Sequence, residues 1–134
     1  MNFTYDQDNA FDEIISNALE AKCCNLTQLQ SFKSSSIYII SDGKKVAGAI
    51  YYIYGETIWL DAIYVEDDFQ KMGFGRKIIE KLIKISAVNG ASQIQLNTYF
   101  KDSVLFFKKC GFDQIAIIPN WKYNLDCYLL RLVL

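Results

Sequence analysis

Residues 57–88 join an apolar run, a glycine-containing turn and an amphipathic run, and they constrain the fold of this chain more than any other stretch. The run TIWLDAIYV has the length and the β-branched and aromatic content of a buried strand. The turn QKMGFG follows, and RKIIEKLIKISAV then places Ile78, Ile79, Leu82 and Ile83 on one helical face. A turn that opens a helix leaves backbone N–H groups free at the positive end of the helix dipole. This stretch therefore predicts a binding site for phosphate oxygens.

Length and charge indicate the broad class of the protein. The chain has 134 residues, of which 51% are hydrophobic and 22% charged, and we expect a single compact domain over residues 1–134. The net charge of -1, from 14 basic and 15 acidic residues, does not favour nucleic acid or anionic membranes as partners. No apolar run reaches the roughly 20 residues of a membrane helix, and the start MNFTYDQDNA is unlike a signal peptide. We therefore expect a cytoplasmic location, with no membrane and no nucleic-acid partner.

The chain contains no histidine, which excludes Ser-His-Asp and Cys-His catalysis. Acid–base chemistry must then use a carboxylate, tyrosine, cysteine, lysine or water. Four cysteines, Cys23, Cys24, Cys110 and Cys127, include no C-x-x-C pair. They are typical of reduced structural thiols, and we expect no metal site.

The hydrophobic periodicity predicts a mixed α/β order of elements. Before the central stretch we expect a short edge strand FTYD, helices at 9–21 and 26–32, and strands at 37–41, 45–55 and 57–65. Tight turns at Asp42-Gly43 and Gly55-Glu56 would join these strands into an antiparallel meander. After it we expect a strand at 93–98, a helix at 103–110 capped by Asp102 or Ser103, a strand at 112–118, a loop at 119–126 and a strand at 127–133. The crossover helix at 75–88 makes its two flanking strands parallel.

Two segments carry a family resemblance. The run YVEDDFQKMGFGRKII resembles the coenzyme A signature of the GNAT superfamily of N-acetyltransferases, in which Gln or Arg, two spacers, Gly, a spacer and Gly or Ala follow one another. In this chain those positions are Gln70, Gly73 and Gly75. Further on, FFKKCGF resembles that superfamily's second recurring segment, FYxKxGF. The turn by itself is also compatible with an ordinary strand–turn–helix junction, and it matches neither a P-loop nor a dinucleotide fingerprint.

The resemblance implies a GNAT-like fold, with a central, mostly antiparallel twisted sheet of six to seven strands, a parallel splayed pair and helices on both faces. It implies transfer of an acetyl group from acetyl-CoA to a primary amine by direct attack in a ternary complex, by a monomer or a homodimer. The acceptor would be an amine on a small molecule or a peptide, held by residues 11–32 and by Trp121, Lys122 and Tyr123. The implied cofactor-binding residues are Ile63, Tyr64, Val65, Gln70, Lys71, Met72, Gly73, Phe74, Gly75, Arg76, Lys77 and Phe107.

Asp61 and Tyr64 are the candidate catalytic residues. Alternation along the strand predicts that Asp61 shares a face with Trp59, Ile63 and Val65, and the family often places its base along this strand. A carboxylate that anchors a neighbouring loop is the alternative for Asp61. The resemblance implies that a backbone N–H near Tyr64 or Val65 stabilises the oxyanion.

The chain departs from the family at Phe107, where the family commonly has a tyrosine that protonates the departing thiolate. Two further family positions, an Asn and an Ala, correspond to Phe100 and Ser103. Tyr99, Tyr64 and Cys110 are candidate substitutes for the missing acid. The departure also leaves open a second function, a non-catalytic coenzyme A-binding or protein-interaction module that retains the fold.

Overall fold

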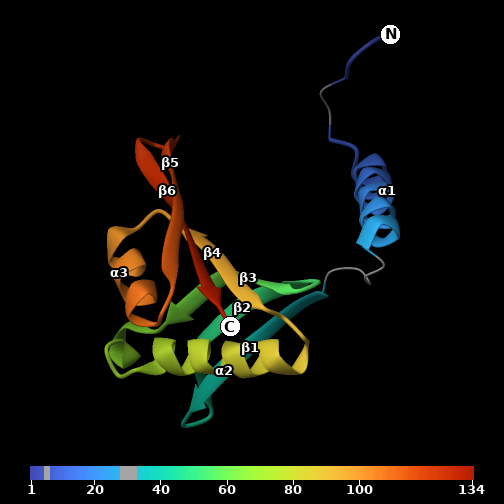
Figure 1. Ribbon diagram of the computed structural model, residues 1–134. Helices are drawn as coiled ribbons and strands as arrows, with labels where there is room; N and C mark the ends of the chain where they lie inside the picture. Colours follow the sequence, from blue (N-terminus) through green and yellow to red (C-terminus); the bar gives the residue numbers. More distant parts are fainter. Residues whose placement is uncertain (5–6, 28–32) are drawn as a thin grey trace. The chain divides into compact units, whose positions relative to one another are not determined.

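The structure is a computed structural model that describes residues 1–4, 7–27 and 33–134 (Figure 1). The chain divides into two compact units, Met1–Ser31 and Phe32–Leu134. Within the described residues, no helix combines the length and the apolar character needed to cross a membrane.

The first unit contains helix α1, Asn9–Thr27. Asp8 caps it, because the Asp8 carboxylate accepts a hydrogen bond from the Phe11 amide at 3.1 Å. The predicted helix at 9–21 is thus confirmed and is longer than expected, since Leu26 and Thr27 continue it. The predicted strand FTYD is wrong at residues 3–4, which are not in a strand, and its other two residues lie outside the described part. The rest of the predicted helix at 26–32 also lies outside it.

The second unit contains a six-stranded sheet in the order β1-β2-β3-β4-β6-β5. Strands β1 (Lys33–Ser41), β2 (Lys44–Tyr54) and β3 (Thr57–Val65) form the predicted antiparallel meander. The first turn has positive φ at Asp42 and Gly43, 48° and 77°, and Gly55 has φ 55° in the second. Both turns are where the sequence places them, because Gly and Asp tolerate this backbone region.

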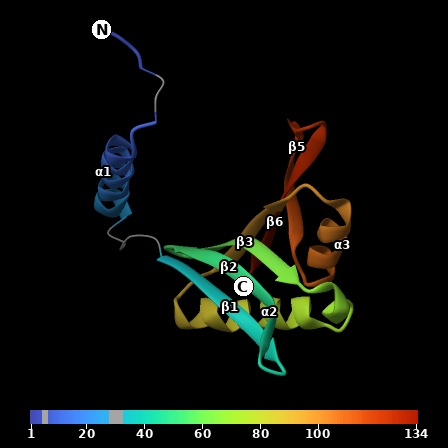
Figure 2. The same cartoon turned by 180° about the vertical axis from the view of Figure 1, so that it is seen from behind.

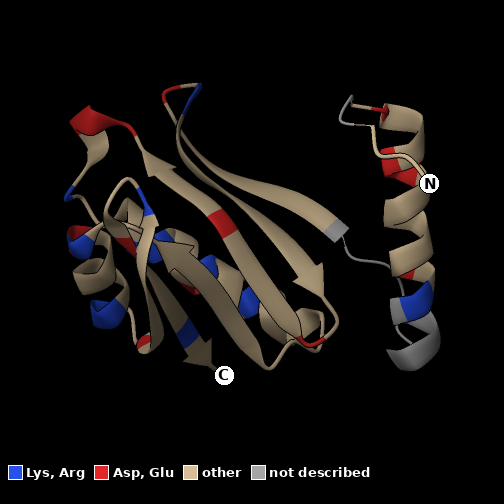
Figure 3. Cartoon of the chain, turned by 90° about the horizontal axis from the view of Figure 1, so that it is seen from above, with Lys and Arg blue, Asp and Glu red and all other residues tan. Residues whose placement is uncertain are grey.

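Helices α2 (Phe74–Val88) and α3 (Lys101–Lys109) follow β3 and β4 (Gln93–Thr98). Figures 1 and 3 show both helices on the same side of the sheet. Their buried residues form one core with Ile58, Leu60 and Ile94. Within this unit the expected helices on both faces are therefore not seen. The reason is that two right-handed crossovers running in the same direction put their helices on one face. Figure 2 shows β1–β3 from the other side.

Helix α3 begins earlier than predicted and without the expected cap. Phe100 holds the capping position and makes no side-chain hydrogen bond there, so the predicted capping by Asp102 or Ser103 is wrong. Asp102 lies instead in the first turn of the helix. Its carboxylate still favours the helix through the dipole.

Strands β5 (Asp113–Lys122) and β6 (Leu125–Val133) form a hairpin where a loop at 119–126 was expected. The turn uses positive φ at Tyr123 and Asn124, 48° and 62°. The Asn120 amide donates to the Asp126 carboxylate at 3.1 Å, across a register shift between Ile118 and Lys122.

Candidate active site

Strands β3 and β4 separate after three residue pairs. They are paired in parallel only at Thr57–Gln93, Ile58–Ile94 and Trp59–Gln95. Beyond these pairs β3 continues to Val65 and β4 to Thr98 without a ladder between them. The expected splayed parallel pair is thus confirmed. The splay leaves backbone groups of both strands available to a ligand.

A β-bulge lies at Asp61, inside the part of β3 that has left β4. In the ladder with β2, Tyr51 is opposite Leu60 and Ile50 is opposite Ala62, so Asp61 has no partner residue. The bulge reverses the alternation of side chains along β3. Trp59 lies opposite Tyr52, whereas Ile63 lies opposite the buried Ala49.

The prediction that Asp61 shares a face with Trp59, Ile63 and Val65 is therefore wrong for the last two. Ile63 and Val65 pack against the core. The Asp61 side chain is exposed, and within the described residues it makes no hydrogen bond and no ion pair. In the described part of the chain nothing supports the alternative role of anchoring a loop.

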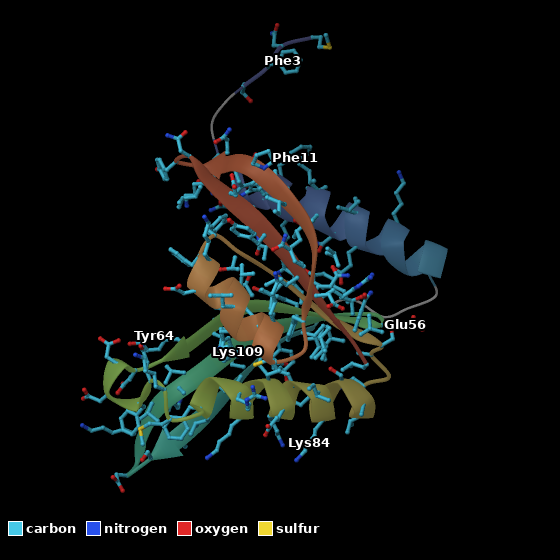
Figure 4. All side chains as sticks on the ribbon, turned by 60° about the vertical axis from the view of Figure 1, so that its left-hand side comes forward. Phe3, Phe11, Glu56, Tyr64, Lys84 and Lys109 are labelled. Carbon is cyan, nitrogen blue, oxygen red and sulfur yellow. The ribbon has the colours of Figure 1, made fainter. Side chains whose placement is uncertain are left out.

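Tyr64 is 63% exposed. It points away from the core, against which its neighbours Ile63 and Val65 pack. Figure 4 shows it at the opposite end of β3 from Glu56, next to the turn that leads into α2. Its side chain lines a cavity of about 290 Å³ together with Ala62 and residues of β1 and β2, among them Tyr38 and Lys45. The Lys45 ammonium lies 4.4 Å from the centre of the Tyr38 ring. The two candidate catalytic residues are thus both accessible on the second half of β3.

The turn after β3 begins with the short helix η1, Asp67–Phe69, and is held by Gln70. The Gln70 side-chain amide donates to the Val65 carbonyl at 3.1 Å and to the Asp67 carboxylate at 3.0 Å. Lys71 has φ 61° and Gly73 has φ 84°, so the chain reverses within a few residues. Gln70, at the first position of the signature, therefore fixes the turn against the end of β3.

Backbone amides are free at the start of α2. In the described part of the chain, the amides from Lys71 to Arg76 have no backbone acceptor, and the Lys77 amide is the first to donate, to the Gly73 carbonyl at 3.1 Å. No side chain caps the helix at Gly73. Free amides at the positive end of a 15-residue helix favour an anion. The phosphate site itself stays a prediction.

Three basic residues, Lys71, Arg76 and Lys77, are close in sequence to these amides, and Figure 3 shows basic residues along α2 and α3 and acidic ones at η1. The Arg76 guanidinium donates to the carbonyl of Lys109, the last residue of α3, at 3.1 Å. The Lys77 ammonium lies 5.4 Å from the centre of the Phe74 ring. Arg76 thus joins α2 to α3.

The two glycines of the turn meet different requirements. Gly73 has a positive φ, and a methyl group built on it would contact nothing within 4 Å. Gly75 has no positive φ, but a methyl group on it would lie 2.9 Å from the Phe106 ring. Gly73 is thus required by backbone conformation, whereas Gly75 is required by the ring of α3 packed against it.

Phe107 is buried in the core, with 4% of its surface exposed. Its ring packs edge-on against Phe106 and Phe112, with centroids 5.1 and 5.4 Å away. Of the candidate substitutes for the missing acid, Tyr99 accepts a hydrogen bond from the Trp121 indole at 3.2 Å. Burial raises the pKa of the Cys110 thiol, and the nearby Arg76 lowers it by a smaller amount. The roles of Phe107, Tyr99 and Cys110 stay predictions.

A second cavity, of about 450 Å³, lies between the segment after β4 and the start of β6, and the sequence does not predict it. Asp102 and Asp126 line it together with three aromatic residues. The run TYFKD at the end of β4 contains two of these aromatic residues and one of the two aspartates. The sequence does not predict the other wall, because the pairing of β5 with β6 places its residues in a hairpin where a loop is expected.

The sequence profile of the Acetyltransferase (GNAT) family matches residues 6–112. The chain belongs to this family. This GNAT chain is 31% identical over 80 residues to the thialysine N-epsilon-acetyltransferase of Sus scrofa, an alignment that covers 55% of the chain and 47% of that protein. It thus spans about half the length of the curated relatives it matches.

Solved structures share the fold of this GNAT chain. One is a crystal structure of an acetyltransferase from Bacillus cereus, with a TM-score of 0.84, 16% identity and coverage of 99% of this chain and 98% of that one. Another is an aminoglycoside 6'-N-acetyltransferase in complex with coenzyme A, with a TM-score of 0.65, 16% identity and coverage of 75% and 72%. The GNAT-like fold predicted from the two segments is confirmed.

Proposed function

We propose that this protein transfers the acetyl group of acetyl-CoA to a primary amine. One observation carries the proposal. The splayed end of β3, the turn held by Gln70 and the free amides before Lys77 follow one another along the chain without interruption. A strand edge that ends at an anion-binding helix terminus suits an extended ligand with a phosphate end, which is the form of coenzyme A. Membership of the GNAT family supports the same ligand.

The residues of the turn fit the cofactor. The amides of Lys71, Met72, Gly73, Phe74, Gly75 and Arg76 would hold the pyrophosphate. Gln70 would act by fixing the turn, and Lys71 and Lys77 would add positive charge near the phosphates. Main-chain groups of Ile63, Tyr64 and Val65 would lie along the pantetheine arm. Acetyl-CoA supplies an activated thioester to this site.

The chemistry assigned to the chain is the handling of a proton and of a developing negative charge. A primary amine must be neutral to form the new N–C bond, so its ammonium form first loses a proton, directly or through water, to Asp61. A backbone N–H near Tyr64 or Val65 would stabilise the oxyanion before the C–S bond breaks. Asp61 suits the first role, because it is exposed and makes no hydrogen bond or ion pair within the described residues. The thiolate can leave and take a proton from water, so the phenylalanine at 107 does not prevent transfer.

Calorimetric titration with coenzyme A tests the cofactor site. Wild type should bind, and Lys77→Ala should bind about 3- to 10-fold more weakly, because a charge-assisted contact to phosphate is worth roughly 1 kcal/mol at an exposed site. Lys84→Ala is the matched control, because Lys84 is an exposed cation farther along the same helix, where Figure 4 shows it. No binding by wild type at millimolar coenzyme A would refute the proposed cofactor.

Release of free thiol from acetyl-CoA across a panel of amines tests turnover. Asp61→Asn should lower kcat by about 100- to 10,000-fold and flatten the pH profile of kcat, since a positioned base contributes on that scale. Asp113→Asn, at an exposed carboxylate of β5, should leave both unchanged. Unaltered kinetics in Asp61→Asn would remove Asp61 as the base.

The buried Phe107 favours a second function, a coenzyme A-binding or protein-interaction module without turnover. Coenzyme A binding without thiol release on any amine would support this second function over the first. The cytoplasmic location, the single-domain organisation and the monomeric or homodimeric state stay predictions from the sequence.

A further inference from the structure

The cavity of about 450 Å³ at the end of β4 has walls from two segments that are distant in sequence. One wall comes directly after β4 and includes the first turn of α3, and the other comes from the hairpin turn and the start of β6. The lining residues are Tyr99, Phe100, Lys101, Asp102, Asn124, Leu125, Asp126 and Tyr128.

Both acidic side chains of the cavity retain accepting capacity. Asp126 is half-buried, and one of its carboxylate oxygens accepts the Asn120 amide at 3.1 Å. Within the described residues, the other oxygen of Asp126 and both oxygens of Asp102 have no hydrogen-bond partner and no ion pair. Lys101 is the one cation among the lining residues, and it is exposed. The carboxylates thus outnumber the cation and could pair with a cation from outside.

The aromatic walls point to the same ligand chemistry. Tyr99, Phe100 and Tyr128 line the same cavity as the two carboxylates, and aromatic rings attract cations. The indole of Trp121 donates to the Tyr99 hydroxyl and so links β5 to this wall. The dipole of α3 accounts for a carboxylate at Asp102, in the first turn of the helix, and the hydrogen bond from the Asn120 amide accounts for one at Asp126. They do not explain why rings and carboxylates line one cavity.

The cavity is next to the opening between β3 and β4. Tyr99 follows Thr98, the last residue of β4, and Tyr128 is paired with Thr98 across the sheet. The unpaired part of β4 begins after Gln95. At about 3.3 Å per residue, Phe100 lies at most roughly 7 Å along the chain from Thr98, the last residue of β4 and one that is not paired with β3. One short aliphatic molecule can therefore reach from the splay into the cavity.

We propose that this cavity binds a second, positively charged group of the acceptor. The substrate class is then small aliphatic amines that carry two or more ammonium groups, one of which is acetylated while another lies between Asp102 and Asp126. The inference rests on the proposed function, because it places the reacting amine at the splay of β3 and β4.

A matched pair of acceptors tests the proposal. Pentylamine and 1,5-diaminopentane have the same carbon chain and differ in the remote ammonium group. Wild type should show a kcat/KM for the diamine about 3- to 20-fold above that for the monoamine, the range expected for two partly screened ion pairs. In the double variant Asp102→Asn/Asp126→Asn this ratio should fall toward two, the statistical factor for a molecule with two equivalent amines. Asparagine retains an oxygen that can still accept the Asn120 amide.

Asp113→Asn is the control, since it removes an exposed carboxylate that is not among the cavity residues and should preserve the ratio. A wild-type ratio of two or less, or an unchanged ratio in the double variant, would overturn the proposal.

A binding measurement separates failure of this inference from failure of the proposed function. In a titration followed by NMR, 1,5-diaminopentane should shift the amide signals of residues 99–102 and 124–128, and the double variant should lose these shifts. This result would support the cavity even if no amine were acetylated, an outcome that would count against the proposed function alone. Absence of the shifts in wild type at tens of millimolar diamine would overturn the cavity assignment whatever the turnover.

Discussion

Substitution of Gly75 by alanine tests why the turn before α2 contains two glycines. The added methyl group would lie 2.9 Å from the tip of the Phe106 ring and 3.3 Å from the neighbouring ring carbon. To reach ordinary contact at 3.4 Å, the ring must retreat by about half an ångström. Phe106 cannot do so freely, because it packs edge-on against the buried Phe107.

The expected magnitude is the difference of two effects. Overpacking of this kind costs about 1–3 kcal/mol in free energy of unfolding. Replacing glycine by alanine in a helix returns up to about 1 kcal/mol, and less in the first turn. Gly75→Ala should therefore destabilise the protein by about 1–2 kcal/mol. Because the methyl group points at α3, coenzyme A affinity should change by less than about threefold, or roughly 0.6 kcal/mol.

Urea denaturation of a double-mutant cycle with Phe106→Leu provides the measurement. Leucine removes the ring tip, so Gly75→Ala should become neutral or slightly stabilising in that background, with a coupling of about 1–2 kcal/mol. Gly73→Ala is the matched control, because its cost of about 1–2 kcal/mol comes from positive φ and should persist in both backgrounds. A Gly75→Ala penalty of the same size with and without the Phe106 ring would refute the packing argument. So would loss of coenzyme A binding at unchanged stability.

Three further substitutions or reactions test other features of the fold. Phe107→Tyr should lower the free energy of unfolding, measured in urea, by about 1–3 kcal/mol, because it adds a hydroxyl to the core. Unchanged stability together with faster thiol release would instead show that a tyrosine at this position acts as a catalytic acid. Gln70→Ala should cost about 1–2 kcal/mol by removing two hydrogen bonds of the turn, and should weaken coenzyme A binding in calorimetry. At pH 8, iodoacetamide should react with Cys110 more slowly than it reacts with the thiol of free glutathione, because the raised pKa of Cys110 lowers the fraction present as thiolate. The reaction with Cys110 should accelerate at a higher pH. Equal rates for the two thiols at pH 8, measured by mass spectrometry, would contradict this.

The stretch from β3 to α2 was predictable because its information is local. The strand Thr57–Val65 and the strand Gln93–Thr98 have the predicted bounds, and α2 begins one residue earlier than expected. Apolar periodicity and two glycines suffice for such elements, since each residue's preference agrees with the fold around it. The free amides at the start of α2 follow from the same local geometry.

The bulge at Asp61 and the hairpin at residues 113–133 were not predictable in the same way. A bulge is a property of the ladder between two strands, and only the register of β2 against β3 shows that Asp61 has no partner. Pro119 and two asparagines are common loop residues, but the pairing of β5 with β6 allows all three within one hairpin.

By itself, the sequence determined the order of the elements, the family resemblance and the position of the glycine-containing turn before α2, because these depend on neighbouring residues. Only the tertiary structure decided which neighbours Gly75 and Phe107 have, and on which face the residues beyond Asp61 lie. It alone also brought Asp102 and Asp126 to one cavity. These facts depend on contacts between segments distant along the chain, and chain order does not specify them.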